Sequence, residues 1–416
     1  MAKYNKNNFK FVKKCQNCNY NKLSKIHSFG FHPTVNDFKL TDSENAGTVN
    51  YPLDLLYCKR CDLVQLGIII HTSEIFPRNY AYRSGTTKIL INNFLDLRKQ
   101  VEKLNLIRKQ DLVIDIGSND GTLLKNFVGN YRLLGVEPTD VAKIAQKNKI
   151  DTLNLPFSKK TSLIIKKKYG KAKLITAANV FAHIENVHDV MKGILNLLDK
   201  DGVFISESHY LISFLKDIQY DTVYHEHLRY YSLNSLQNLF KTYGMEIFHV
   251  KKIPTHGGSI RVFASKIGTH KISASSRAMI MNEPKGVTLK KMLDAFSKKT
   301  SLSKLSINKL LYELKLKNKL IFGISAPSRA STLINYLGLD NKIINYISEV
   351  KGSLKIGKNI PGTNIPVVLE EISNKNHNDI AIIFSWHIKN ELMNILRKKG
   401  FKGKFIIPLP RVKVVK

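Results

Sequence analysis

The sequence predicts an α/β protein that is divided into three units. Short apolar strands alternate with amphipathic helices in two separate stretches, a pattern typical of parallel sheets with crossover helices. The first part of the chain instead carries two C-x-x-C pairs, and 416 residues are too many for one ordinary core. We therefore expect an N-terminal metal-binding unit over residues 1–88, a central α/β domain over 89–265 and a smaller C-terminal α/β domain over 266–416.

The four cysteines form the pairs "CQNC" and "CKRC", which contain Cys15, Cys18, Cys58 and Cys61. Two such pairs with no cysteine left over are typical of a tetrahedral zinc site. Four thiolates leave no open coordination position, so the zinc would be structural. A redox pair is disfavoured, because neither motif opens a helix after a strand. The metal would staple a unit that is too small to build much core by itself.

The central unit begins with a helical pattern, "TKILINNFLDLRKQVEKLN". The expected strands are "DLVIDIG", "YRLLGVEP", "AKLITAANV" and "VFISES", followed by "MEIFHVKKI" and "SIRVFASK". Helices are expected from "TLLKNFV", at "AKIAQKN", at "DVMKGILNLLDKDG" with closure at Gly202, and at "SLNSLQNLFKTYG" after a serine cap.

The C-terminal unit begins with a lysine-rich amphipathic helical region at about residues 285–319. The strand and helix alternation then restarts. We expect strands at "KLIFGIS", "IINYISE", "DIAIIFS" and "GKFIIPLP", and helices at "RASTLINYLG" and "NELMNILRKKG".

The stretch "VIDIGSNDG" predicts a strand, a glycine turn and the start of a helix. Gly117 and Gly121 allow the backbone to approach a ligand closely, and the helix offers its N-terminal amides. Asp115 ends the strand and Asn119 lies in the turn. Glu137 ends the next strand, where an acid accepts hydrogen bonds from ribose hydroxyls. These features predict a nucleoside site but do not separate a dinucleotide from S-adenosylmethionine.

The stretch "YHEH" gathers Tyr224, His225, Glu226 and His227 at the expected carboxyl edge of the sheet. In an extended conformation His225 and His227 share one face. They could be metal ligands, although no third ligand stands at fixed spacing. The stretch could also be a polar loop. The third interpretation is proton abstraction from a carbon acid, in which a histidine is the base, a carboxylate orients it, and a tyrosine or second histidine stabilises the enolate.

The glycine turn, Glu137 and the polar end of the third strand, "AANVFAHIENV", resemble the class I methyltransferases. This resemblance implies a Rossmann-like fold that binds S-adenosylmethionine. Gly117 and Gly121 would flank the methionine part of the cofactor, Glu137 would hold its ribose, and Asn179 would line the site.

Nearly the whole chain resembles the three-domain, zinc-containing sugar C-methyltransferases. This family methylates C-3 of nucleotide-linked 4-keto-6-deoxy sugars in deoxysugar or surface polysaccharide biosynthesis. The matching motifs are the two cysteine pairs, "NYAYRSGTT", "DIGSNDG", "GVEP", "NVFAHIENVHDV", "YHEHLRYYSL", "THGGSIRVFA", "APSRASTLINYLG", "KIGKNIPGTNIPV" and "FSWH". The order of these motifs is more specific than any one of them, and "YHEH" followed by "THGGS" is the most telling part.

The family implies roles for the matching residues. His227 would be the base that takes the C-3 proton, with Glu226 as its partner. The remaining candidates for the sugar site are Tyr224, His183, His225, His256, Tyr80 and Tyr82. Two alternatives stay open at this point. The two N-terminal tyrosines could instead pack between domains, and His256 could be a buried structural histidine.

The turn in "ISAPSRASTL" would meet the nucleotide diphosphate, since a helix N-terminus suits phosphate. The candidates are Ser325, Ser328 and Arg329. The commoner family pattern has Lys-Gly-Asn where this chain has Arg329-Ala330-Ser331, which leaves the identity of the base and sugar open. An ordinary helix cap by Ser328 or Ser331 is the alternative.

The chain has 66 Lys and Arg against 32 Asp and Glu, a formal net charge of +34. The lysines spread along the chain among many Asn and Ile residues, so we interpret the charge as a compositional bias and expect no nucleic-acid partner. A zinc-containing RNA-binding or RNA-methylating protein remains the alternative from another class, and methylation of another small molecule is the alternative among enzymes. No long apolar run and no signal peptide are seen, and we expect a cytoplasmic monomer.

Overall fold

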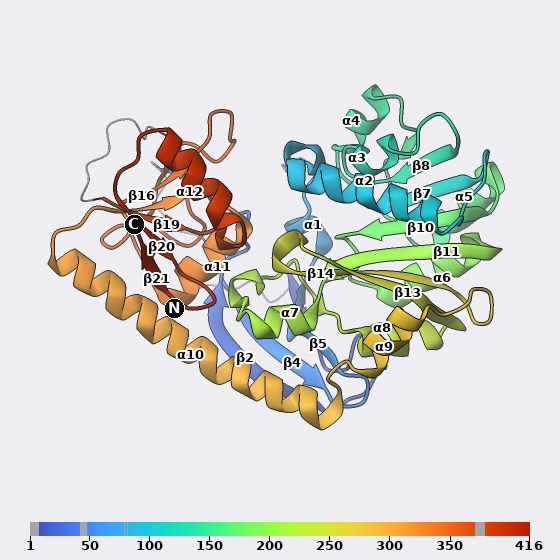
Figure 1. The fold of residues 1–416 in the computed structure, drawn as a ribbon, viewed down its shortest axis with the longest axis horizontal. Coiled ribbons are helices and arrows are strands. Elements are labelled where there is room, and N and C mark those ends of the chain that lie inside the picture. Colours follow the sequence, from blue (N-terminus) through green and yellow to red (C-terminus); the bar gives the residue numbers. More distant parts are fainter. Residues whose placement is uncertain (1–7, 42–47, 79, 81, 371–378) are drawn as a thin grey trace.

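The computed structural model of the protein describes residues 8–41, 48–78, 80, 82–370 and 379–416. It has a four-stranded, a seven-stranded and a six-stranded sheet, together with two small two-stranded pairs. The α/β fold with an N-terminal cysteine-bearing unit and two further α/β units is confirmed. Figure 1 shows the seven-stranded sheet at the right, the six-stranded sheet at the left, and the N-terminal strands between and below them.

The N-terminal unit is an antiparallel sheet, which is more regular than the short pieces that the sequence indicated. Its elements are β1 (Phe9–Phe11), β2 (Leu23–His32), β3 (Lys39–Leu40), β4 (Tyr51–Cys58), β5 (Leu63–Leu66), β6 (Ile68–Ile70) and α1 (Thr72–Ile75). The sheet order is β12-β5-β4-β2, and β12 (Arg229–Tyr230) comes from the segment that follows "YHEH". A strand of the central unit therefore completes the N-terminal sheet, so the two units are built together.

The central sheet has the order β13-β14-β11-β10-β7-β8-β9. Its strands are β7 (Leu112–Ile116), β8 (Arg132–Val136), β9 (Thr152–Leu153), β10 (Ala172–Ala178), β11 (Leu198–His209), β13 (Met245–Ile253) and β14 (Ser259–Lys266). The helices are η1 (Ser84–Thr86), α2 (Lys88–Lys103), α3 (Thr122–Lys125), α4 (Ala142–Lys147), α5 (Lys159–Tyr169), α6 (Val187–Leu197), α7 (Leu211–Lys216), η2 (Tyr220–Thr222), α8 (Leu233–Lys241) and η3 (Thr255–Gly257). The sheet is parallel from β9 to β11, while β14 and β13 close it with antiparallel pairing.

Two expectations for this unit were wrong or incomplete. The helix α6 ends at Leu197 rather than at Gly202, because β11 follows it directly. Gly202 lies inside that strand, where a Cβ atom would come within 2.9 Å of the Ala172 carbonyl oxygen. This glycine therefore permits a close approach of two backbones. The sequence analysis also missed β9 and the helix α5.

The C-terminal unit has the sheet order β18-β16-β15-β19-β20-β21. Its strands are β15 (Ile321–Ile324), β16 (Tyr346–Glu349), β17 (Lys358–Asn359), β18 (Val367–Leu369), β19 (Ile380–Ile383), β20 (Lys404–Ile407) and β21 (Lys413–Val415). The helix α9 (Ala274–Met281) packs on β13 of the central unit, and the helices that follow are α10 (Gly286–Leu316), α11 (Ser328–Leu337), η4 (Trp386–Ile388) and α12 (Lys389–Lys398). The last strand, β21, is antiparallel to β20.

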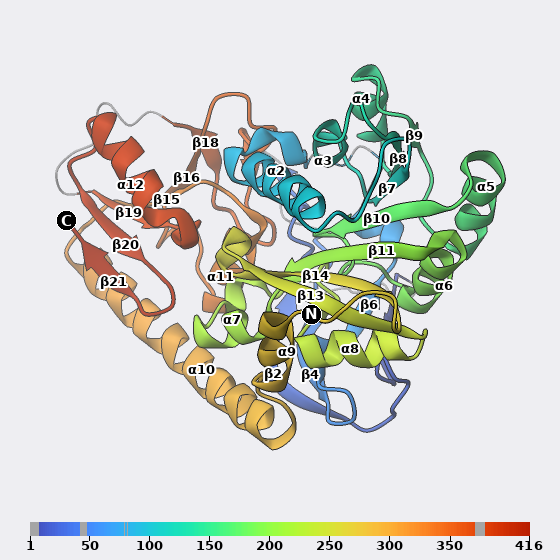
Figure 2. The same ribbon diagram turned by 45° about the vertical axis from the view of Figure 1, so that its right-hand side comes forward.

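Several elements join the three units. The long helix α10 runs from the central unit to the C-terminal unit and contacts α7, β2 and α11 (Figures 1 and 2). The short strands β3 and β17 pair with each other, which links the N-terminal and C-terminal units. The helix α11 contacts both η2 and β2. The segment around "YHEH" thus lies where all three units meet.

A buried charged network ties α2 to the central sheet. Arg261 of β14 is fully buried and forms an ion pair with Glu207, which is buried on β11. The guanidinium also donates to Asp96 at 2.8 Å and to Asn93 at 3.0 Å, both on α2. The Asn93 amide donates to Glu207 at 2.8 Å. This network fixes the middle of α2 against β11 and β14.

We expect Arg261→Met to destabilise the protein by about 3–5 kcal/mol, because it leaves the buried Glu207 carboxylate without its cation. The double variant Arg261→Met/Glu207→Gln should lose clearly less than the sum of the two single variants. Urea unfolding of the four proteins measures this coupling. Purely additive losses would contradict the network.

Candidate functional site

The four cysteines converge as the sequence predicted. Their sulfur atoms all lie within 4.8 Å of one another, with Cys15 and Cys61 at 3.4 Å and Cys18 and Cys58 at 3.6 Å. Tetrahedral zinc with bonds of about 2.3 Å places its sulfur ligands about 3.8 Å apart. The geometry and the all-sulfur donor set therefore fit a closed structural zinc site. Within the described ranges, no other group of three or more His, Cys, Asp or Glu side chains could hold a metal ion.

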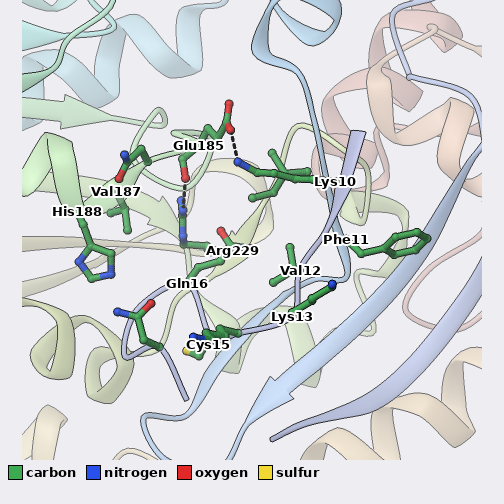
Figure 3. A pocket seen from close by; sticks show the side chains of 14 residues that line it. Lys10, Phe11, Val12, Lys13, Cys15, Gln16, Glu185, Val187, His188 and Arg229 are labelled. Atoms are coloured by element: carbon green, nitrogen blue, oxygen red, sulfur yellow. Dashed lines mark hydrogen bonds and ion pairs between the residues drawn. The ribbon is translucent and has the colours of Figure 1, made fainter. Parts of the chain in front are cut away.

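The zinc unit is joined to the central unit through Arg229. This buried side chain donates to the carbonyl oxygens of Ile184 at 2.6 Å and Glu185 at 2.9 Å. Figure 3 shows the side chains of Arg229, Cys15 and Glu185 beside a cavity of about 410 Å³. Burial lowers the pKa of Arg229, while nearby Tyr231 and Cys15 oppose that effect. A cation at this place complements the negative charge of a zinc tetrathiolate and connects it with the strand that follows "YHEH".

The "YHEH" segment is a tight turn, so the extended conformation considered above is wrong. The backbone N–H of His227 donates to the carbonyl oxygen of Tyr224 at 2.9 Å. The side chains consequently diverge. His225 packs against Tyr51 and bonds to the Pro52 carbonyl oxygen at 3.3 Å. The turn thus separates His225 from His227, and a metal site that uses both histidines finds no support in the described residues.

The ring of His227 has a defined orientation. Its Nδ1 lies 2.8 Å from the carbonyl oxygen of Thr222. Because a carbonyl oxygen only accepts, Nδ1 carries the proton and the neutral ring leaves Nε2 free to take another. The His227 ring packs on Tyr224, with the ring centroids 4.0 Å apart. The orienting acceptor is therefore Thr222, where Glu226 was expected.

His227, which is buried, is part of a cluster with three half-buried histidines. Its ring centroid lies 4.9 Å from that of His183 and 5.0 Å from that of His209, whose ring is 5.4 Å from His256. Burial is the main cause that lowers the pKa of every member. The pKa values of His183 and His256 fall to about 4, and those of His209 and His227 fall well below 6.5. The cluster is neutral at pH 7 and so can accept a proton.

Glu226 faces the N-terminal unit. Its carboxylate accepts a hydrogen bond from the Asn36 amide at 2.6 Å and from the Tyr80 hydroxyl at 3.4 Å. Burial raises the pKa of Glu226 to about 7, although these two donors and the charge of Lys355 oppose the shift. Tyr80 and Tyr82 are neighbours, with ring centroids 6.4 Å apart. Partial desolvation raises the pKa of Tyr82 to about 12 although the residue is 46% exposed, so its hydroxyl stays protonated at pH 7.

The glycine turn after β7 has the expected geometry. Gly117 and Gly121 have φ angles of 69° and 79°, the left-handed region that favours glycine. The Glu137 carboxylate accepts the Asn119 N–H at 3.0 Å. Its other oxygen accepts both the N–H and the hydroxyl of Thr139, at 2.9 and 2.6 Å, so the oxygen bonded to Asn119 is the one that keeps a second lone pair for a ligand hydroxyl.

Asp115 and Asn179 stand at the ends of neighbouring strands in this site. Asp115 accepts a hydrogen bond from the Thr176 hydroxyl at 2.6 Å, and burial raises its pKa to about 7. Asn179 follows β10 with a φ of 58°, and its N–H donates to the Glu207 carbonyl oxygen at 3.0 Å. These residues, with the turn, fit S-adenosylmethionine at the carboxyl edge of the sheet.

The turn also holds the loop that carries the two tyrosines. The Asn119 side chain donates to the Tyr82 carbonyl oxygen at 3.1 Å and accepts the Ser84 N–H at 2.8 Å. Asp120 accepts the Gly85 N–H at 2.9 Å. The glycine turn after β7 and the loop that carries Tyr80 and Tyr82 are therefore held together by these hydrogen bonds.

The C-terminal turn approaches the same cluster through Arg329. Its Nε lies 3.6 Å from the Asp221 carboxylate, and an Nη lies 2.9 Å from His387. Asp221 also accepts the Trp386 indole N–H at 2.8 Å. A further Nη–H of Arg329 points to the His256 carbonyl oxygen at 3.5 Å. These contacts join the residues just before "YHEH" to the C-terminal unit.

The two serines of this turn occupy different places. Ser325 has a φ of 58° and its hydroxyl donates to the Ile324 carbonyl oxygen at 2.7 Å. Ser328 is the first residue of α11, whose cap is Pro327 without a side-chain bond. A helix cap by Ser328 or Ser331 is therefore excluded.

The sequence analysis missed His209, Asp221, Thr222, Asn36 and Lys355. Asp221 and Thr222 are separated from "YHEH" by Val223 alone, and their polar character near that motif was the available signal. Lys355 lies in the motif "KIGKNIPGTNIPV", to which no role was assigned, while His209 and Asn36 are distant in sequence and carried no local pattern.

Comparisons with known proteins agree with this architecture. Family descriptions match a zinc binding domain at residues 15–76, a methyltransferase domain at 90–250 and a C-methyltransferase C-terminal domain at 254–410. The chain is 30% identical over 412 residues, 97% of both chains, to the C-methyltransferase NovU of Streptomyces niveus.

Solved structures of methyltransferases overlap with part of the chain. An S-adenosylmethionine-dependent methyltransferase from Clostridium acetobutylicum is 16% identical, with a TM-score of 0.35 over 44% of this chain and 94% of that one. The magnesium protoporphyrin IX methyltransferase from Synechocystis is 13% identical, with a TM-score of 0.31 over 42% and 77% of the two chains.

Among the described residues, no helix is both long and apolar enough to cross a membrane.

We expect the purified protein to hold one zinc ion per chain, and Cys58→Ser to lose most of it together with thermal stability, because a tetrathiolate site needs every ligand. Elemental analysis and a thermal melt measure both effects. After chelation, Zn²⁺ but not Mg²⁺ should restore the melting temperature. Full stability of the metal-free protein would contradict a structural role.

Proposed function

Because the chain belongs to the C-methyltransferase family, we propose that it methylates the carbon next to the ketone of a nucleotide-linked 4-keto-6-deoxy sugar, at C-3. The chain is an S-adenosylmethionine-dependent enzyme with a zinc-binding domain. The sugar, the nucleotide and the methylated carbon are the proposal. The observation that carries it is the orientation of the His227 ring. Thr222 holds this ring through Nδ1, so that Nε2 is free within the histidine cluster at the carboxyl edge of the sheet.

Carbon methylation needs a carbon nucleophile, and a ketone makes the neighbouring C–H acidic enough for a positioned base. His227 suits this role because its tautomer is fixed and its pKa keeps it neutral at pH 7. The C–H electron pair moves toward the ketone as the proton passes to Nε2, which gives an enolate. Bound S-adenosylmethionine supplies an electrophilic methyl group for the nucleophilic carbon.

The enolate oxygen needs a hydrogen-bond donor as negative charge develops. Tyr224 lies against His227, and burial raises its pKa well above 10, so its hydroxyl is protonated. Neutral His183 is a second donor beside His227. We assign these two side chains to the sugar oxygen. His256, next to His209, would border the same space.

Glu226, Tyr80 and Tyr82 would close the sugar site from the N-terminal side. Glu226 is anchored by Asn36 and Tyr80 rather than by the base, so it is suited to bind a sugar hydroxyl. His225 points toward Pro52, and we propose only an indirect, positioning role for it. Asp115, Gly117, Asn119, Gly121, Glu137 and Asn179 would bind the cofactor, and Ser325, Ser328 and Arg329 would border the nucleotide.

His227→Asn should lower kcat by about 10²–10⁴-fold, since it removes the general base, while S-adenosylmethionine binds as in the wild type. His71→Asn, at an exposed histidine, is the matched control. The assay follows labelled methyl from S-adenosylmethionine into nucleotide-linked 4-keto-6-deoxy sugars and, in parallel, into total RNA. Acid-stable label in the sugar supports the proposal. Label in RNA alone would overturn it in favour of the nucleic-acid alternative.

The pH dependence should report Glu226. Its pKa of about 7 means that the carboxylate ionises as the pH rises from 6 to 8. If the ionised form binds the sugar, kcat/KM rises through this window, and Glu226→Gln removes the rise. His227 adds no limb there, because burial holds its pKa well below 6.5. An unchanged profile in the Gln variant would show that another group titrates.

A further inference from the structure

Arg329, the cation that the sequence assigns to the diphosphate, already has partners within the protein. Arg329 is 7% exposed, lies 3.6 Å from the Asp221 carboxylate and packs 5.4 Å above the Trp386 ring. Its remaining nitrogens lie near His387 and the His256 carbonyl oxygen. Much of its charge is therefore balanced within the protein. A dianionic diphosphate would need another cation nearby.

Lys355, in the motif "KIGKNIPGTNIPV", is a cation whose charge is less fully balanced within the protein than that of Arg329. Its ammonium donates to the Ala326 carbonyl oxygen at 2.5 Å and lies 5.3 Å from the ring of Phe38. In the described part of the chain it forms no ion pair, although the charges of Glu349 and Glu226 both act on it. Since an ammonium has three donors, Lys355 keeps N–H groups available for a ligand.

Lys355 lies between the turn that would hold the sugar and the turn that would hold the nucleoside. Ala326 precedes α11, and its N–H donates to the Glu349 carboxylate at 2.7 Å. The same device holds the cofactor turn, where Glu137 accepts the Asn119 N–H. A parallel strand, a turn and an acid on the next strand form a nucleoside site. The second turn is thus built like the first one, with Lys355 directly beside it.

A nucleotide sugar has its diphosphate between the sugar and the nucleoside. Glu226, on the turn that would hold the sugar, is within electrostatic reach of Lys355. Ala326, on the turn that would hold the nucleoside, is in direct contact with it. A cation between these two turns stands where the diphosphate has to pass. This turn leads into the N-terminus of α11, which begins at Ser328.

We propose that Lys355 binds the diphosphate of the substrate. This inference rests on the proposed function and names a binding residue that the motif analysis left unassigned. Glu349 orients the turn. Burial lowers the pKa of Lys355, and the charge of Glu349 counteracts this lowering.

The test compares Lys355→Met with Lys351→Met, a matched change at an exposed lysine of the same loop. Calorimetry with thymidine diphosphate and uridine diphosphate should show that Lys355→Met weakens the tighter of the two by about tenfold or more, as expected for a charge-assisted bond. The KM for the nucleotide sugar should rise with kcat little changed. S-adenosylhomocysteine affinity should match the wild type, which controls for folding, and Lys355→Gln replaces the Met variant if that one does not fold.

Three outcomes would overturn the inference. The first is a Lys355→Met variant with diphosphate affinity within twofold of the wild type. The second is a variant whose kcat falls while its KM is unchanged, which would mean that Lys355 acts on Glu226 and not on the diphosphate. The third is a wild type that methylates the nucleotide sugar yet binds neither diphosphate, which leaves the proposed function intact. Diphosphate binding without methylation of any nucleotide sugar would instead overturn the proposed function alone.

Discussion

The hydrogen bond from the His227 N–H to the Tyr224 carbonyl oxygen determines the geometry of the site, because it turns four neighbouring side chains in different directions. His227 and Tyr224 pack against each other, while Glu226 turns toward the N-terminal unit and His225 toward Pro52. An extended strand would have placed both histidines on one face. The turn gives each residue a separate environment and therefore a separate role.

A turn of this kind is stable only when other units hold it. Buried titratable groups lose hydration, and the lowered histidine pKa values and the raised Glu226 pKa record that loss. The cost is offset from three sides. Asn36 and Tyr80 bind Glu226 from the N-terminal unit, Trp386 binds Asp221 from the C-terminal unit, and β12 completes the zinc-stapled sheet directly after the turn. The structural zinc thus supports the "YHEH" turn at a distance.

Local sequence patterns predicted the parts that depend on local chemistry. The cysteine spacing, the glycine turn and the alternation of strands and helices each appear where the residues indicated. The same patterns could not predict contacts between units. Trp386 and Asp221 are 165 positions apart, and the partner of His227 is a backbone carbonyl, which leaves no trace in residue identity. Gly202 was misread because a helix stop and a close strand contact use the same residue.

The central claim is that His227 removes a proton from the carbon next to a ketone before methylation. The most direct measurement is deuterium exchange at that carbon, in deuterated water, with a nucleotide-linked 4-keto-6-deoxy sugar and S-adenosylhomocysteine in place of the methyl donor. The account predicts that the wild type catalyses exchange and that His227→Asn does not. Exchange at the wild-type rate in the variant, or methylation by a wild type that catalyses no exchange, would contradict it.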